Sequence, residues 1–127
     1  MQTGQEVEES SAYSLFVYAA RSPLTRDYYL RRLGIFFNHI NLLPNETKEE
    51  RCNFFAVQGI KNPNWAFSYI IKFLQFQKEG VQREEITGAT LRNFVKSIKL
   101  FCEMSDIPIA WKKNYSRITK DAETCGR

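Results

Sequence analysis

The stretch NPNWAFSYIIKFLQFQKEG (Asn62–Gly80) decides the fold that we expect for this chain. It opens with asparagine and proline and closes with glycine, the residue types that start and stop helices. Its apolar residues cover well over half of a helical wheel, and a helix this apolar is normally the buried centre of a bundle. The sequence therefore predicts a central helix from Asn62 to Gly80. The apolar residues are Trp65, Phe67, Tyr69, Ile70, Phe73, Leu74 and Phe76.

A helix is predicted to begin at Ser22, well before this stretch. Ser22 and Thr25 are capping residue types, and Pro23 between them suits the first helical position. Pro44 and Asn45 are expected to end the helix. Its inner face is formed by apolar residues at helical spacing: Tyr29, Leu33, Phe36 and Ile40, widened by Leu30 and Phe37.

A shorter helix is predicted from Thr47 to Gly59. Thr47 and Glu50 have the spacing of a capping box, in which each side chain satisfies a backbone amide of the other residue. This helix is expected to contribute Cys52, Phe54, Phe55 and Val57 to the core. A further helix or turn is predicted over residues 12–20.

The last helix is predicted from Thr90 to Met104, after a turn at Thr87 and Gly88. The residues from Ile107 to Trp111 are expected to be extended and to pack Trp111 against the helix bundle. The predicted fold class is therefore all-α, a compact bundle of four to five helices with short connections. The inner face of the last helix is Leu91, Phe94, Val95, Ile98, Phe101 and Cys102.

Length and charge divide the chain into one domain and two flanking segments. Its 127 residues are 43% apolar, and the ten Phe, six Tyr and two Trp suffice for the core of one domain. The net charge of +4 is uneven, because residues 1–20 carry −3 and residues 86–120 carry +5. We expect a disordered acidic leader (1–11), a helical domain (12–111) and a basic, linker-like tail (112–127).

Several function classes are excluded by what the sequence lacks. Cys52, Cys102 and Cys125 form no C-x-x-C pair, and an acidic N-terminus does not suit a signal peptide, so reduced thiols and a cytoplasmic location are expected. The single histidine, His39, has no metal-ligand neighbours, and no apolar run could span a membrane. No phosphate-binding loop or catalytic motif is present, so neither enzyme activity, a cofactor, a metal nor a small-molecule substrate is predicted.

The clearest polar pattern is a row of cations on the last predicted helix. Arg92, Lys96 and Lys99 are spaced i, i+4 and i+7, which places them on one side of a helix, as a row of DNA phosphates would require. Glu103 continues the row at i+11, and a solvated helix face with an internal Lys99–Glu103 pair explains the same pattern and is the better interpretation from these residues alone. The aromatic residues fall at core spacing, which favours packing over base stacking.

The order of these segments resembles a known family. Ser22-x-x-Thr25-x-x-x-Tyr29-x-x-x-Leu33-x-x-Phe36 resembles the opening helix of the core-binding domain of tyrosine recombinases (phage-type integrases). The stretch Ile98–Ile107, followed by Trp111-Lys112-Lys113, is similar to integrase-type proteins of archaea. The resemblance covers residues 21–113 and implies a SAM-like bundle that clamps double-stranded DNA mainly through its backbone. The contact residues it implies are Thr25, Arg26, Arg32, Thr90, Arg92, Lys96 and Lys99.

The chain departs from that family at its C-terminal end. The family's catalytic domain should follow Lys113, but the sequence stops at Arg127, and Tyr115 lacks the surrounding catalytic residues. We therefore expect duplex DNA binding linked to site-specific recombination and DNA integration, without strand cleavage. The alternative is a protein-interaction module that pairs with a full-length recombinase or with its own copies, for which Leu100 on the polar side of the last helix is a candidate contact. A truncated remnant with little function is the third interpretation.

Overall fold

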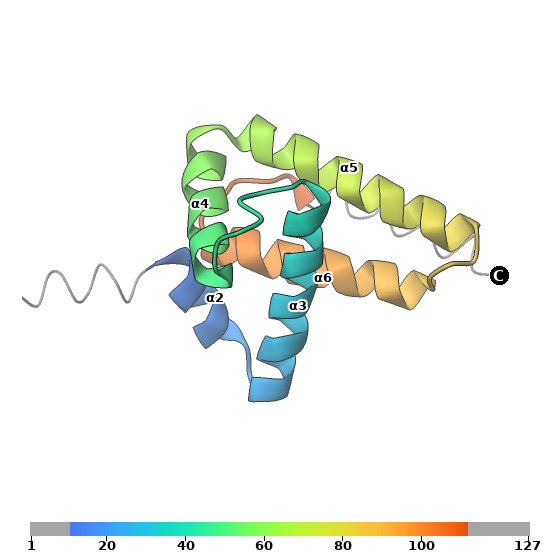
Figure 1. The fold of residues 1–127 in the computed structure, drawn as a ribbon, viewed down its shortest axis with the longest axis horizontal. Helices are drawn as coiled ribbons and strands as arrows, with labels where there is room; N and C mark the ends of the chain where they lie inside the picture. The colour runs from blue at the N-terminus through green and yellow to red at the C-terminus, as the bar shows by residue number, and fades with distance from the viewer. Residues whose placement is uncertain (1–10, 112–127) are drawn as a thin grey trace, which may run out of the picture.

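The computed structural model describes residues 11–111, which form five helices and no strand (Figure 1). The predicted all-α bundle is confirmed, and the segment predicted as a helix or turn over 12–20 is a helix. The tail 112–127 and, apart from Ser11, the leader 1–11 lie outside the described residues. The helices are α2 (Ala12–Ala19), α3 (Pro23–His39), α4 (Lys48–Lys61), α5 (Pro63–Gln82) and α6 (Gly88–Met104).

A side-chain cap precedes each of these helices, and the predicted starts of α3, α4 and α5 coincide with their caps, whereas α6 begins at Gly88 rather than at the predicted Thr90. The cap side chain in each case accepts a hydrogen bond from the backbone N–H three residues later, satisfying a donor that the helix itself leaves free. The predicted capping box is present, since the backbone N–H groups of Thr47 and Glu50 each donate to the other's side chain at 3.1 Å. The five caps are Ser11, Ser22, Thr47, Asn62 and Thr87.

The predicted helix ends at two glycines are wrong. Gly59 and Gly80 lie inside α4 and α5, both are buried, and neither has the positive φ of a terminating glycine. A Cβ on Gly59 would lie 2.8 Å from Cδ1 of Ile107 and 3.3 Å from Cβ of Ala66. Gly59 therefore leaves room for the Ile107 side chain of the segment after α6, which the sequence of α4 alone does not reveal.

The end predicted for α3 at Pro44 and Asn45 is also too late. The helix ends at His39, and the chain then turns through Asn41 and Leu43, which have φ values of 55° and 41°. Residues with side chains rarely adopt this left-handed region, so the turn needs support from its surroundings. Arg51 of α4 supplies part of that support, because its Nε donates to the Leu42 carbonyl at 2.8 Å.

We expect Gly59→Val to lower the free energy of unfolding by about 2 kcal/mol, because its side chain must displace Ile107 in a packed interior. Gly34→Val is the matched control: Gly34 lies within α3, and a Cβ there would meet nothing within 4 Å. That change is expected to be neutral or slightly stabilising. Urea unfolding of both variants checks the difference, and equal effects would contradict the packing role of Gly59.

The core is a continuous cluster of aromatic rings. Phe16, Phe36, Phe55 and Phe101 are at most 1% exposed, and they come from α2, α3, α4 and α6 respectively. Ring centroids of Phe36 and Phe55 lie 5.5 Å apart, and those of Phe16 and Phe101 lie 5.6 Å apart, both with edge-to-face geometry. The prediction that the aromatic residues mainly form a core is confirmed.

The predicted central helix, α5, shares the central position with α6, because each of the two packs on three other helices. Figure 1 shows α5 running along α6 while α3 crosses it, and α6 packs on α2, α3 and α5. On α5 the apolar side chains extend beyond the covered side, so that Phe76 is 49% exposed. A wide apolar arc therefore does not show by itself how much of a helix is buried. The buried surface depends on which neighbouring helices cover it.

Two predicted core residues of α4 lie on its outer side. Phe54 and Val57 are 38% and 48% exposed, whereas the smaller Ala56 is buried. Cys52 and Phe55 are buried as predicted. The extended segment after α6 also lies as predicted, with Trp111 only 8% exposed.

Candidate nucleic-acid interface

The three cations of α6 share one side of the helix. On a wheel of 100° per residue, Arg92, Lys96 and Lys99 fall within about 60° of one another, on the side opposite to the buried residues. Lys96 is exposed, and Arg92 and Lys99 are half-buried. We call these three residues the α6 cationic face. The buried residues of the helix are Leu91, Phe94, Val95, Ser97, Ile98, Phe101 and Cys102.

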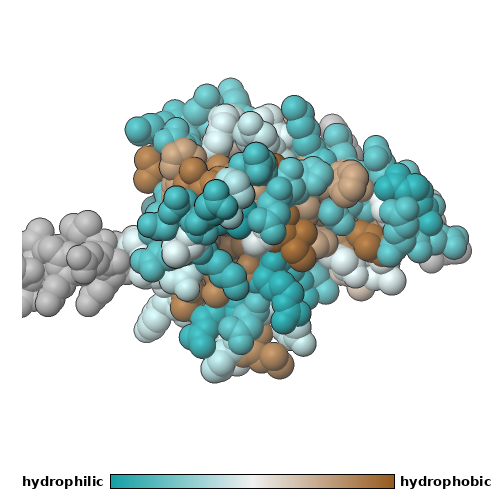
Figure 2. Space-filling view, in the orientation of Figure 1, coloured by the Kyte–Doolittle hydropathy of each residue, from teal (hydrophilic) through white to brown (hydrophobic). Residues whose placement is uncertain are grey.

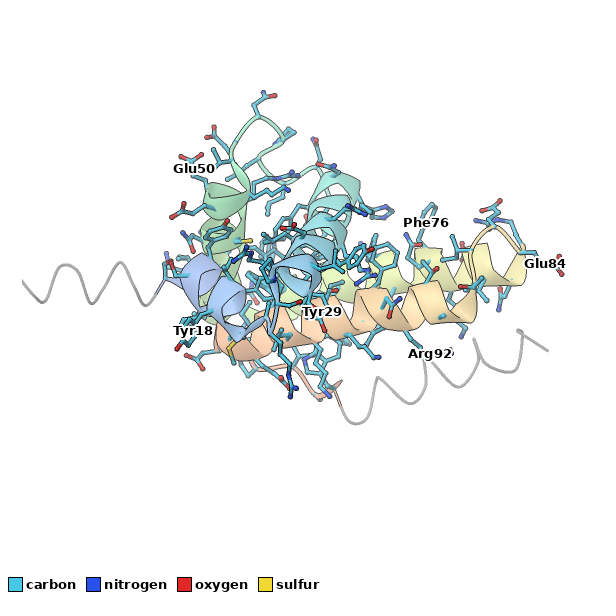
Figure 3. The ribbon with its side chains drawn as sticks, turned by 90° about the horizontal axis from the view of Figure 1, so that it is seen from below. Tyr18, Tyr29, Glu50, Phe76, Glu84 and Arg92 are labelled. Carbon is cyan, nitrogen blue, oxygen red and sulfur yellow. The ribbon has the colours of Figure 1, made fainter. Side chains whose placement is uncertain are left out.

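Figure 3 shows that Arg92 and Phe76 project to opposite sides of the α5–α6 pair. The α6 cationic face is thus separated from the apolar surface where the His39 ring lies 4.9 Å from that of Phe76. Glu103, after Lys99, is the first carboxylate within α6. The stretch from Arg92 to Lys99 consequently presents positive charge without an acidic residue in between.

Glu103 lies on the same side of α6 one turn after Lys99, and further acidic side chains lie in the turn before α6. Arg83 pairs with Glu85, with Nε and Oε2 3.1 Å apart, and this hydrogen bond raises the pKa of Arg83. Glu84 projects from the same tip of the molecule (Figure 3). A phosphate at the N-terminus of α6 would meet these carboxylates, whose negative charge opposes the attraction of the helix end.

The two threonines among the expected DNA contacts serve as helix-start residues. The Thr25 hydroxyl accepts from the Ser22 hydroxyl at 3.0 Å, and its backbone N–H donates to the same oxygen at 3.2 Å. The Thr87 and Thr90 hydroxyl groups likewise lie 3.1 Å apart, and the Thr90 backbone N–H donates to the Thr87 hydroxyl, also at 3.1 Å. Both backbone amides are therefore already used by caps, so local structure accounts for these threonines.

The two arginines expected on α3 do not share a face. Arg26 and Arg32 are about 120° apart on the helical wheel, and both are half-buried. The Arg32 guanidinium lies 5.4 Å from the centroid of the Tyr28 ring, and that of Arg31 lies 5.3 Å from it. This Tyr28 cluster was missed by sequence reasoning, although the i, i+3 and i, i+4 spacings could have indicated it. Of the expected contact set, the structure thus brings only Arg92, Lys96 and Lys99 together on one helix face.

Other reactive groups of the described residues are buried or isolated. Burial raises the pKa of both Cys52 and Cys102 to about 12, so these thiols stay protonated at neutral pH. Residues 11–111 contain no group of three or more His, Cys, Asp or Glu side chains that could hold a metal ion. Within the same range, no helix is long and apolar enough to cross a bilayer. Cys125 lies outside the described residues.

No protein-family model, curated protein or solved structure matches this chain. The similarity to recombinase core-binding domains stays a prediction. A proposal for function therefore depends on the charge and geometry of the described helices.

Proposed function

We propose that the helical domain binds double-stranded DNA through the α6 cationic face, as a core-binding-type module of site-specific recombination and DNA integration, without cleaving strands itself. The observation that carries the proposal is the alignment of Arg92, Lys96 and Lys99 opposite seven buried residues of the same helix. Because the opposite side is packed into the core, the backbone that presents these cations is rigid, and little ordering entropy is lost on binding.

The dimensions of this face suit a DNA backbone. From Arg92 to Lys99 the helix axis advances about 10 Å, at 1.5 Å per residue. A strand of duplex DNA presents one phosphate per roughly 3.4 Å of its axis, so about three phosphates fall within that length. Lysine and arginine side chains are long enough to adjust to the exact positions, which favours backbone binding with modest sequence preference.

Leu100 does not support the alternative function, a protein-interaction module. This residue was expected to project from the polar side of α6 and to contact a full-length recombinase. In the structure Leu100 is half-buried and packs against the core. Its apolar character is therefore explained by packing within the domain.

We expect the dissociation constant for a short duplex to rise about 40-fold between 50 and 200 mM salt if three phosphates are contacted, because each contact releases condensed counterions. Fluorescence anisotropy with a labelled duplex at several salt concentrations measures this dependence. A dissociation constant that changes less than about threefold over that range would rule out binding through phosphates.

A further inference from the structure

The outer side of α4 carries apolar side chains that DNA binding would not use. Phe54, Val57 and Ile60 are 38%, 48% and 51% exposed. They project away from the buried side of the helix, which includes Cys52 and Phe55. Figure 2 shows hydrophobic surface at the edge of the molecule where α4 lies. A helix that is apolar on both sides normally has a second partner.

The order of residues along this outer side is self-complementary. Glu50, Phe54, Val57 and Lys61 are spaced i, i+4, i+7 and i+11, and they fall within about 60° on the helical wheel. The intervals of four, three and four residues are the same in both directions. When two such helices lie antiparallel, Glu50 of each faces Lys61 of the other, and Phe54 of each faces Val57 of the other.

The charges at the two ends of this row favour that orientation. Glu50 and Lys61 are both exposed. The hydrogen bond from the Thr47 backbone N–H lowers the pKa of Glu50, so its carboxylate is ionised at neutral pH. A parallel pair would bring like charges together at both ends, whereas an antiparallel pair brings opposite charges together. Antiparallel helix dipoles add to the same preference.

A groove beside this row extends its apolar surface. The groove has a volume of about 670 Å³ and is lined by residues of α2, α4 and the end of α6, including Leu15, Val57, Ile60 and Met104. Leu15 is 37% exposed. The groove gives the Phe54 ring of a second molecule an apolar site next to Val57 and Ile60.

We propose that the chain forms a two-fold dimer in which α4 packs antiparallel against α4 of a second copy. Phe54 and Val57 form the centre of the interface, Glu50 and Lys61 form ion pairs at its two ends, and Leu15 and Ile60 flank it. The partner is a second copy because the row of residues matches itself both in apolar contacts and in charge. The pairing involves none of the α6 cations, so it does not depend on DNA binding.

Analytical ultracentrifugation of the full chain without DNA tests this proposal. We expect the wild-type protein to sediment as a dimer at tens of micromolar and Val57→Glu to weaken the dimer by about 30-fold or more, since two-fold symmetry buries two unpaired carboxylates. Ile35→Glu is the matched control, because Ile35 on α3 is 42% exposed and lies outside the row. It should leave the dimer intact. A wild-type monomer at about 200 μM overturns the proposal, as does a Val57→Glu dimer of unchanged affinity.

A charge exchange tests the antiparallel register. Lys61→Glu should weaken the dimer about tenfold, because it places two carboxylates opposite each other at both ends. The double variant Glu50→Lys, Lys61→Glu restores opposite charges and should recover most of that loss. Circular dichroism confirms folding, since Glu50 also belongs to the capping box. A folded double variant that dimerises no better than Lys61→Glu would overturn the register.

Discussion

Reversing the charge of both Arg92 and Lys96 to glutamate is expected to weaken duplex DNA binding about 100-fold near 100 mM salt. The change removes two phosphate contacts and places two carboxylates against the DNA backbone, where like charges repel over roughly 10 Å. Both residues project from the side of α6 opposite to the core, Lys96 exposed and Arg92 half-buried, so the unfolding temperature should change little. Fluorescence anisotropy measures the affinity, and thermal unfolding followed by circular dichroism checks the fold.

The matched control is Lys48→Glu with Lys72→Glu, which changes the net charge by the same amount. Both lysines are exposed, on α4 and α5 respectively, and neither lies on the α6 cationic face. This variant is expected to lose only a fewfold in affinity. If both double variants lose the same affinity, binding responds to net charge alone and the assigned face is wrong.

Truncating Phe101 to alanine is expected to lower the free energy of unfolding by about 4 kcal/mol. Phe101 is 1% exposed, and its ring centroid lies 5.6 Å from that of Phe16, 6.2 Å from that of Phe37 and 6.1 Å from that of Phe55. It therefore joins α6 to α2, α3 and α4 through one side chain. Because small domains are stable by only about 5–15 kcal/mol, a loss of this size removes a large part of the total.

Phe76→Ala provides the comparison for this loss, since the same side chain is removed from a surface position. Phe76 is 49% exposed on α5, and its truncation should cost less than about 1 kcal/mol. Urea unfolding of both variants and of the wild type gives the two differences. Equal costs would contradict the central position of Phe101 in the core.

The starts of the helices could be predicted because capping is a local interaction. Ser22, Thr47 and Asn62 each lie three residues before the N–H group that they accept from, so the sequence contains both partners. The ends could not be predicted in the same way. Gly59 and Gly80 look like stop signals, but both lie inside their helices, and at Gly59 a Cβ would approach Ile107 to 2.8 Å.

The candidate site, like the helices, could be predicted only where it depends on residues of a single helix. The shared side of Arg92, Lys96 and Lys99 follows from helical periodicity within one element. The placement of Arg26 and Arg32 relative to that face depends on how α3 crosses α6, which no spacing within α3 specifies. The outer position of Phe54 and Val57 could not be predicted either, because it depends on which helices pack against α4. The sequence shows that a residue is apolar but not whether another helix covers it.

The sequence by itself determined the all-α class, the starts of α3, α4 and α5, the burial of most of the aromatic core and the cationic side of α6, because each depends on helical periodicity or on partners three or four residues apart. Only the tertiary structure decided that α6 shares the central position with α5, and that α4 leaves apolar side chains on its outer side. It also placed Arg51, which is 7% exposed, against the turn after α3. These features depend on contacts between distant segments, where the shapes of several helices must fit together at once.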